Sequence, residues 1–151
     1  NKKNILVIPE GIPSEVDIFI KFIIKCNDFI DHKFIIRLHP VIKNNKKYIK
    51  ILKETPNILI SKKNLSDDIE RSKFALYRGS SLVVNCLRNG LIPLYLNFDQ
   101  SQINIDPIYD MKNLIINNVS DLQKLLNSKK NEMRYQTNMN FFSKYKSKFF
   151  V

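Results

Sequence analysis

The sequence contains no tryptophan, only three glycines, and two residues each of cysteine and histidine among its 151 residues. With so few thiols and imidazoles, and with no CxxC or HxxxH spacing, neither a disulfide framework nor a structural metal site is expected. No apolar run approaches the roughly 20 residues that cross a bilayer, and no signal peptide leads the chain. Cys26 and Cys86 fall in apolar helical patterns, which indicates buried, reduced thiols of a cytoplasmic protein.

Acidic residues are also scarce, because 25 lysines and arginines face 14 aspartates and glutamates, a net charge of +11. Such an excess favours anionic partners: nucleotides, nucleic acid or an anionic membrane face. Genome composition is an alternative explanation, since lysine (20), isoleucine (22) and asparagine (18), all with A/T-rich codons, dominate the sequence. Arginine, the better bidentate reader of phosphate, occurs five times. This scarcity disfavours a dedicated nucleic-acid binder.

Short apolar, β-branched runs alternate with amphipathic stretches over the first 128 residues. We predict strands at 4–8, 34–38, 57–61, 74–77, 91–96 and 114–116, and helices at 13–27, 44–54, 66–72, 79–89 and 121–128. Ser66-Asp67-Asp68 and Ser120 are expected to cap two of these helices, and Gly90 to end the fourth. Continuous apolar strands that alternate with helices are typical of a parallel sheet covered on both faces. The pattern therefore predicts a doubly wound α/β fold of about six strands.

Ligands of open parallel sheets bind outside the carboxyl ends of the strands, so the residues after each strand are the candidates for a site. Glu10 and Gly11 follow the first predicted strand, and His39 and Pro40 follow the second. Arg37 lies one residue inside the second strand and is a secondary candidate, because its side chain is expected to point away from the face of His39.

Gly79-Ser80-Ser81 stands where the fourth strand changes into a helix. Backbone N–H groups and the dipole at a helix start attract anions, and the two hydroxyls add further donors. The alternative is that one serine simply caps the helix. A histidine at a strand end is likewise more often a surface or structural residue. Because His39 and Ser80-Ser81 are expected at the same sheet edge, we favour His39 as a phosphate partner rather than a general base.

The strand-terminal RLHP (37–40), the later GSS (79–81) and the following NGLIPLYL (89–96) together resemble the donor-binding C-terminal half of GT-B glycosyltransferases. The closest likenesses are the bacterial sialyltransferase and Kdo-transferase types of capsule and lipooligosaccharide synthesis. Polyol-phosphate transferases of the CDP-glycerol type look similar as well. The likeness covers about residues 4–128 and implies half of a GT-B fold. It also implies a nucleotide-sugar substrate, most simply CMP-activated sialic acid or Kdo, with no metal cofactor.

For individual residues, the resemblance implies that His39, Ser80 and Ser81 contact the phosphate of the donor. It also implies that His39 is catalytic, because it stabilises the departing nucleotide. The segment from Pro9 to Gly11 would form part of the donor cleft. Asn85 stands where many relatives carry an acidic residue that holds a ribose, so this chain departs from the pattern there.

The catalytic base and the contacts to a glycan acceptor usually belong to an N-terminal domain in such enzymes. This chain does not contain that domain, and it begins without methionine. We therefore expect a piece of a longer protein that is inactive alone, with residues 1–128 as its nucleotide-sugar-binding domain.

Residues 129–151 interleave six basic residues with aromatic ones and contain one acidic residue. We predict a C-terminal helix that packs back on the domain, or on a missing N-terminal domain. Attachment to the inner membrane through this helix is the alternative.

A different class of function is a non-catalytic, flavodoxin-like module that binds nucleic acid or protein. The spread of lysines over several predicted helices counts against nucleic acid as its partner.

Overall fold

A computed structural model describes residues 4–99, 105–109 and 114–128. Its centre is a sheet of six strands: β1 (Asn4–Val7), β2 (Phe34–Ile36), β3 (Ile58–Ile60), β4 (Ser72–Tyr77), β5 (Ile92–Leu96) and β6 (Leu114–Ile116). All pairings are parallel, in the order β3-β2-β1-β4-β5-β6. The predicted doubly wound, Rossmann-like α/β fold is therefore confirmed. The C-terminal helix predicted at 129–151 lies outside the described residues.

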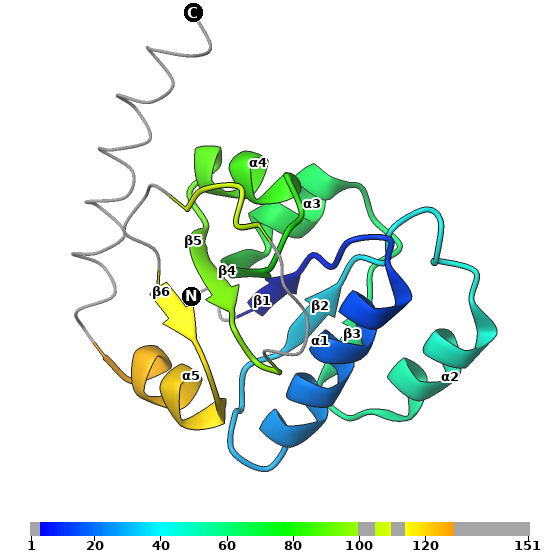
Figure 1. Cartoon of the computed structure of the whole chain (residues 1–151), viewed down its shortest axis with the longest axis horizontal. Helices are drawn as coiled ribbons and strands as arrows, with labels where there is room; N and C mark the ends of the chain where they lie inside the picture. Colours follow the sequence, from blue (N-terminus) through cyan, green and yellow to red (C-terminus); the bar gives the residue numbers. More distant parts are fainter. Residues whose placement is uncertain (1–3, 100–104, 110–113, 129–151) are drawn as a thin grey trace, which may run out of the picture.

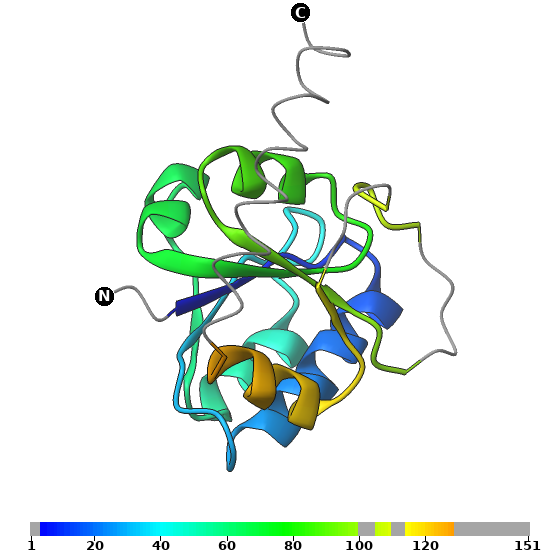
Figure 2. The same ribbon diagram turned by 90° about the vertical axis from the view of Figure 1, so that its left-hand side faces the viewer.

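Five helices cover the two faces of the sheet (Figure 1). One face carries α1 (Pro13–Cys26), α2 (Lys46–Glu54) and α5 (Val119–Leu126), and the other carries α3 (Leu65–Glu70) and α4 (Leu82–Arg88), as Figure 2 shows. In β1, Ile5 and Val7 belong to the first core and Leu6 to the second. Because successive side chains enter opposite cores, the strand must be apolar throughout.

Three helices begin at an asparagine whose side-chain oxygen accepts backbone N–H groups. Asn45 accepts from the N–H groups of Lys47 and Tyr48, and Asn64 and Asn118 each accept from the third residue of their helices. The caps predicted at Ser66-Asp67-Asp68 and at Ser120 are therefore wrong, since these residues lie inside α3 and α5. The reason is that the amide oxygen one turn earlier already satisfies the first free N–H groups.

The predicted end of α4 is confirmed. Gly90 adopts a left-handed φ of 94°. The N–H of Gly90 donates to the Leu87 carbonyl at 3.1 Å, and the N–H of Leu91 donates to the Cys86 carbonyl at 3.0 Å. This pair of bonds is a Schellman motif, and glycine adopts its left-handed conformation without a Cβ penalty.

A buried ion pair joins three elements under the carboxyl edge of the sheet. Arg78, directly after β4, is 2% exposed, and its Nε donates to both carboxylate oxygens of Glu15 at 3.1 Å. Its Nη1 donates to the carbonyl of Leu96 at 2.8 Å. Glu15 lies in the first turn of α1 and Leu96 is the last residue of β5. The pair therefore fixes the start of α1 relative to the ends of two strands.

A second ionic cluster surrounds Asp68, whose side chain is fully buried. Arg37 and Arg71 each donate to it at 2.7 Å, and the Ser61 hydroxyl also donates to it. Burial alone would raise the pKa of Asp68, but these three hydrogen-bond donors and the charge of Arg71 outweigh it and hold the pKa below its usual 3.8. Arg37 also donates to the Lys63 carbonyl at 2.7 Å, so the cluster ties the ends of β2 and β3 to α3.

We expect Arg78→Met to lower the free energy of unfolding by about 3 kcal/mol, because the Glu15 carboxylate stays buried without its arginine. The double variant Glu15→Leu/Arg78→Met should recover most of that loss, since no uncompensated charge remains. Urea denaturation of the wild type, both single variants and the double variant measures the coupling. Additive losses in the double variant would contradict a coupled pair.

We expect Asp68→Asn to lower the free energy of unfolding at pH 7 by about 2 kcal/mol, because two arginines lose their carboxylate. Since the pKa of Asp68 is lower in the folded chain than in the unfolded one, its contribution is complete well above 3.8 and is lost as the pH falls through the folded-state value. Urea titrations should therefore show a smaller difference between variant and wild type at acidic pH. The exposed neighbour Asp67→Asn is the control and should stay within about 0.5 kcal/mol of the wild type.

Candidate functional site

The strand order reverses at the carboxyl ends of β1 and β4, where sheets of this kind are expected to open a crevice for ligands. From β1 the chain continues outward to β2 and β3, and it then returns to the other side of β1 as β4. At such a reversal the connections leave in opposite directions and open a crevice between neighbouring strands, where ligands bind. Glu10 and Gly11 follow β1, and Gly79, Ser80 and Ser81 follow β4. These predicted site residues therefore flank the crevice.

His39 and Gly11 come from neighbouring strands and lie directly against each other. A Cβ atom built on Gly11 would stand 2.6 Å from Nδ1 and 2.8 Å from Cγ of the His39 ring. No real Cβ contact is that short. The His39 imidazole therefore packs directly on Gly11, where a larger residue would collide with it. The missing side chain of Gly11 thus accommodates the His39 ring and does not leave the backbone open.

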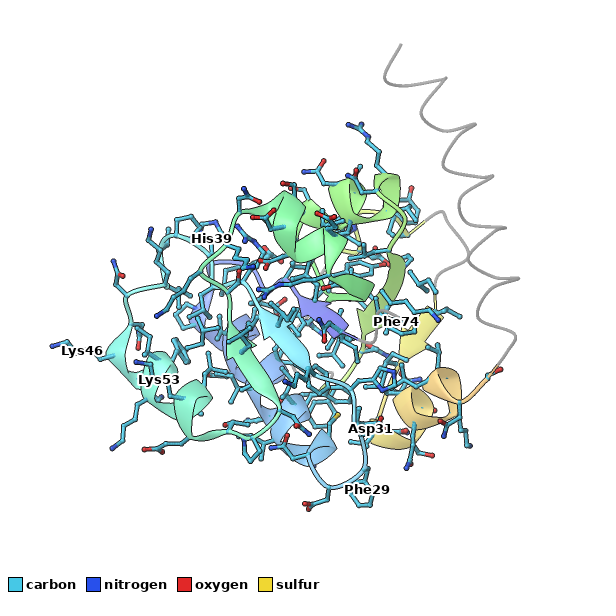
Figure 3. The ribbon with its side chains drawn as sticks, turned by 180° about the vertical axis from the view of Figure 1, so that it is seen from behind. Phe29, Asp31, His39, Lys46, Lys53 and Phe74 are labelled. Atoms are coloured by element: carbon cyan, nitrogen blue, oxygen red, sulfur yellow. The ribbon has the colours of Figure 1, made fainter. Side chains whose placement is uncertain are left out.

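The His39 ring is also held by the turn that it starts. The N–H of Val41 donates to Nδ1 at 3.2 Å, and the His39 carbonyl accepts from Ile42 and Lys43 at 2.8 and 2.9 Å. Pro40 needs no backbone partner in this turn. Because Nδ1 accepts, the neutral ring carries its proton on Nε2. His39 is exposed at this edge, where Figure 3 labels it, and Nε2 is the nitrogen suited to donate to a ligand.

The segment between β4 and α4 is a loop, so the prediction that a helix starts at 79 is wrong by three residues. The Ser80 hydroxyl accepts the N–H of Leu82 at 3.3 Å, which satisfies one N–H group at the start of α4. Ser81 is exposed, and its hydroxyl makes no capping bond to α4. Gly79 does not adopt the left-handed conformation that Gly90 does. The two serines thus differ: Ser80 caps, and Ser81 presents its hydroxyl to solvent.

The site residues do not all meet. β2 and β4 lie on opposite sides of β1, so the ends that carry His39 and Ser80 are two strand spacings, or about 10 Å, apart. Arg37 is engaged with Asp68 and the Lys63 carbonyl, which gives it a structural role beneath the edge. A ligand that joined His39 to the serines would have to span the crevice.

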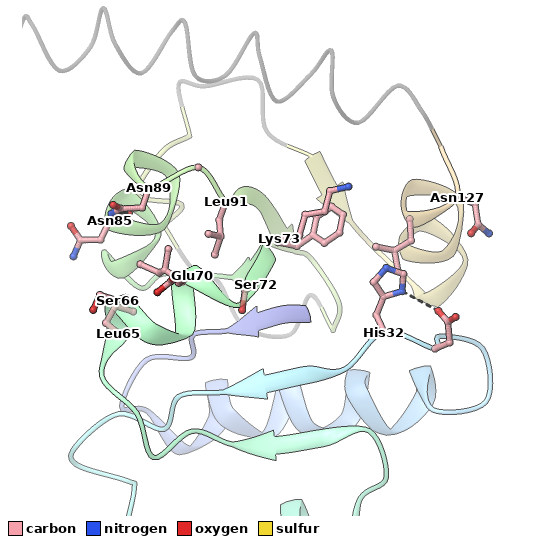
Figure 4. Close-up of a pocket in the computed structure, with 15 residues that line it drawn as sticks. His32, Leu65, Ser66, Glu70, Ser72, Lys73, Asn85, Asn89, Leu91 and Asn127 are labelled. Atoms are coloured by element: carbon pink, nitrogen blue, oxygen red, sulfur yellow. Dashed lines mark hydrogen bonds and ion pairs between the residues drawn. The ribbon is translucent and has the colours of Figure 1, made fainter. Parts of the chain in front are cut away.

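Asn85 lies on α4, one turn beyond Ser81. It lines a cavity of about 1070 Å³ at the opposite end of β4, between α3, α4 and α5 (Figure 4). The cavity also contacts His32, whose Nδ1 lies 3.1 Å from Asp31, and Ser72, whose buried hydroxyl has no hydrogen-bond partner within the described chain. The six residues of β4 separate this cavity from the crevice by roughly 16 Å.

Sequence reasoning singled out neither the Glu15–Arg78 pair nor the Asp68 cluster. The two partners of the first pair are 63 residues apart along the chain. The available signal is that Arg78 directly follows the apolar residues 74–77, where a solvated side chain has little room. Ser72 and His32 carried no signal, because nothing local to either residue marks a cavity.

Other kinds of chemistry find no support in the part of the chain that the structure describes. No group of three or more histidine, cysteine or carboxylate side chains there could hold a metal ion. Burial raises the pKa of Cys26 and of Cys86 to about 12, so both stay thiols and are poor nucleophiles. Among the described helices, none has the length and apolarity to span a bilayer.

Comparison with solved structures shows a likeness in fold. The crystal structure of TarM, a GT-B glycosyltransferase, matches 95% of this chain with a TM-score of 0.58 and 16% sequence identity. The chain spans 30% of the length of TarM. The sequence matches no protein-family model and no curated protein. At this identity the likeness shows the fold, so the chain has a Rossmann-like sheet consistent with one domain of a GT-B glycosyltransferase.

Proposed function

We propose that this chain binds the donor of a GT-B glycosyltransferase, a nucleotide sugar, across the crevice between β1 and β4. The observation that supports it most is the seating of His39 on Gly11 beside the point where the strand order reverses. That arrangement presents a fixed N–H donor from one side of the crevice. Gly79 and Ser81, which follow β4, would supply donors from the other side.

The chemistry follows from where charge develops. When a sugar leaves its nucleotide, negative charge grows on the phosphate that stays behind, and fixed donors stabilise it. His39 would donate to the phosphate through Nε2 in the neutral form, in which Nδ1 accepts the Val41 N–H. Because the two sets of donors are about 10 Å apart, they suit different oxygens of an extended nucleotide better than one phosphate group. No proton needs to be abstracted by His39 in this role.

The donor that we favour is a CMP-activated sugar, such as sialic acid or Kdo, for a bacterial surface polysaccharide. A CDP-glycerol-type polyol-phosphate transfer is the alternative, and both share a cytidine nucleotide. The glycan acceptor and the base would belong to chain outside these 151 residues. Glu10, half-buried after β1, would contact a sugar hydroxyl, whereas Asn85 lines another cavity and is a weaker candidate for the ribose.

Titration of the ¹⁵N-labelled chain with CMP, CDP and UDP tests the proposal by NMR. We expect amide shifts at Gly11, His39 and Gly79–Ser81 with at least one nucleotide, and none with cytidine, which lacks the phosphate. A non-catalytic module would show no shifts with any nucleotide, and that result would overturn the proposed function.

We expect His39→Ala to weaken binding of the best nucleotide about tenfold or more, the loss of one hydrogen bond to a charged group. His32→Ala is the matched control, because it removes the other histidine, which lies at the far end of the sheet. Calorimetry should give the control an affinity equal to that of the wild type. Equal losses in both variants would show that His39 has no special contact with the nucleotide.

The variant Gly11→Ala tests the contact between Gly11 and the His39 ring. Its new methyl group would collide with the His39 ring, which is exposed and can swing away, so the free energy of unfolding should change by less than about 1 kcal/mol. Nucleotide affinity should fall as far as it does in His39→Ala, because the displaced ring no longer faces the crevice. A variant that binds as tightly as the wild type would refute the role of Gly11.

A further inference from the structure

The positive charge of the described domain is concentrated along one edge. Between residues 43 and 63 the chain carries seven lysines and a single carboxylate, Glu54, an excess of six positive charges. All described residues together hold 16 basic and 12 acidic side chains, an excess of four. The remainder of the described chain is therefore slightly acidic. The seven residues, named here the lysine edge, are Lys43, Lys46, Lys47, Lys50, Lys53, Lys62 and Lys63.

The fold gathers the lysine edge on one side of the sheet. β3 is the outermost strand there, and α2 packs against it (Figure 1). Lys46, Lys50 and Lys53 repeat at helical spacing along the exposed side of α2, while Tyr48 and Leu52 fill its buried side. Figure 3 shows Lys46 extending from α2 away from the sheet. Lys43 precedes α2, and Lys62 and Lys63 follow β3, so all seven lysines lie along this edge of the domain.

These charges are not neutralised by the protein. All seven side chains are exposed, and none forms an ion pair with a carboxylate of the described residues. The first turn of α2 contains no acidic residue. Keeping several unpaired like charges together costs repulsion energy, which an external anionic surface relieves.

The composition of the lysine edge favours one kind of anionic partner. No arginine occurs between residues 43 and 63, and the one aromatic ring there, Tyr48, is buried. Readers of nucleic acid use arginine forks and exposed aromatic rings, and this surface has neither. Flexible lysines suit the diffuse charge of lipid headgroups. Val41, which precedes Lys43 by two residues, is 79% exposed and supplies an apolar contact for the headgroup layer.

We propose that the lysine edge binds the surface of a bilayer that contains anionic lipids. The binding is peripheral and electrostatic: the lysines contact headgroup phosphates, and Val41 contacts the interface without insertion of the helix. This proposal rests on charge and exposure alone, so it holds or fails independently of the proposed nucleotide site. It is also distinct from any contact that residues 129–151 make.

Vesicle co-sedimentation of the full chain tests it, with phosphatidylcholine alone and with phosphatidylcholine containing phosphatidylglycerol. We expect binding only to the second kind, and a steep fall in affinity as salt is raised. The variant K46Q/K47Q/K50Q/K53Q should bind at least about tenfold more weakly. Its fold is checked by circular dichroism, and nucleotide binding should be unchanged, because these residues lie outside the crevice.

The control variant K21Q/K25Q/K33Q/K124Q removes the same number of charges elsewhere on the domain and keeps the basic residues of 129–151. Its vesicle affinity should stay within about twofold of that of the wild type. Equal losses in the two variants would reduce the effect to net charge and overturn the proposal. Full binding by both variants, or binding of a short DNA duplex by a wild-type chain that ignores the vesicles, would overturn it as well.

Discussion

The carboxyl edge of this sheet depends on the buried contact between Glu15 and Arg78. The pair holds the start of α1, the end of β4 and the carbonyl that ends β5 in one place. Two buried charges are costly to desolvate, so such a pair is a weak source of stability and a strong source of geometry. Removing either partner leaves the other charge uncompensated. The loops that flank the crevice begin at these elements, so the ion pair also fixes the positions at which the loops start.

Sequence patterns predicted the architecture because its causes are local. Continuous apolar runs at regular intervals are enough to indicate a parallel sheet, and Gly90 is enough to end α4. The errors have local causes too, since Asn64 and Asn118 compete successfully with the serines that follow them. The ionic contacts could not be predicted from the sequence, because no pattern in it connects Glu15 to Arg78, or Arg37 to Asp68. They arise only when the strand order brings their elements together.

The candidate site could be predicted as a set of positions but not as a geometry. That His39 and Gly79–Ser81 share a sheet edge follows from parallel strands alone. The contact between Gly11 and the His39 ring does not follow from it. The segment that contains Gly11 was expected to form part of the donor cleft, but the imidazole occupies the space beside Gly11. Arg37 and Asn85 have side chains that could bind a ligand, but the fold uses them elsewhere. Arg37 forms an ion pair with Asp68, and Asn85 lines another cavity. Whether nucleotides bind here stays a prediction.

The two proposals have a common geometric consequence. Lys43 belongs to the turn that begins at His39, and the Lys63 carbonyl is bonded to Arg37, so the lysine edge adjoins the carboxyl edge of the sheet. A domain attached to a bilayer through this surface would hold the crevice beside the headgroups. An acceptor carried on a lipid would then reach the donor by diffusion in two dimensions. The turn at 39–43 thus links the two proposals: its first residue is the proposed phosphate partner His39, and its last is the first of the seven lysines.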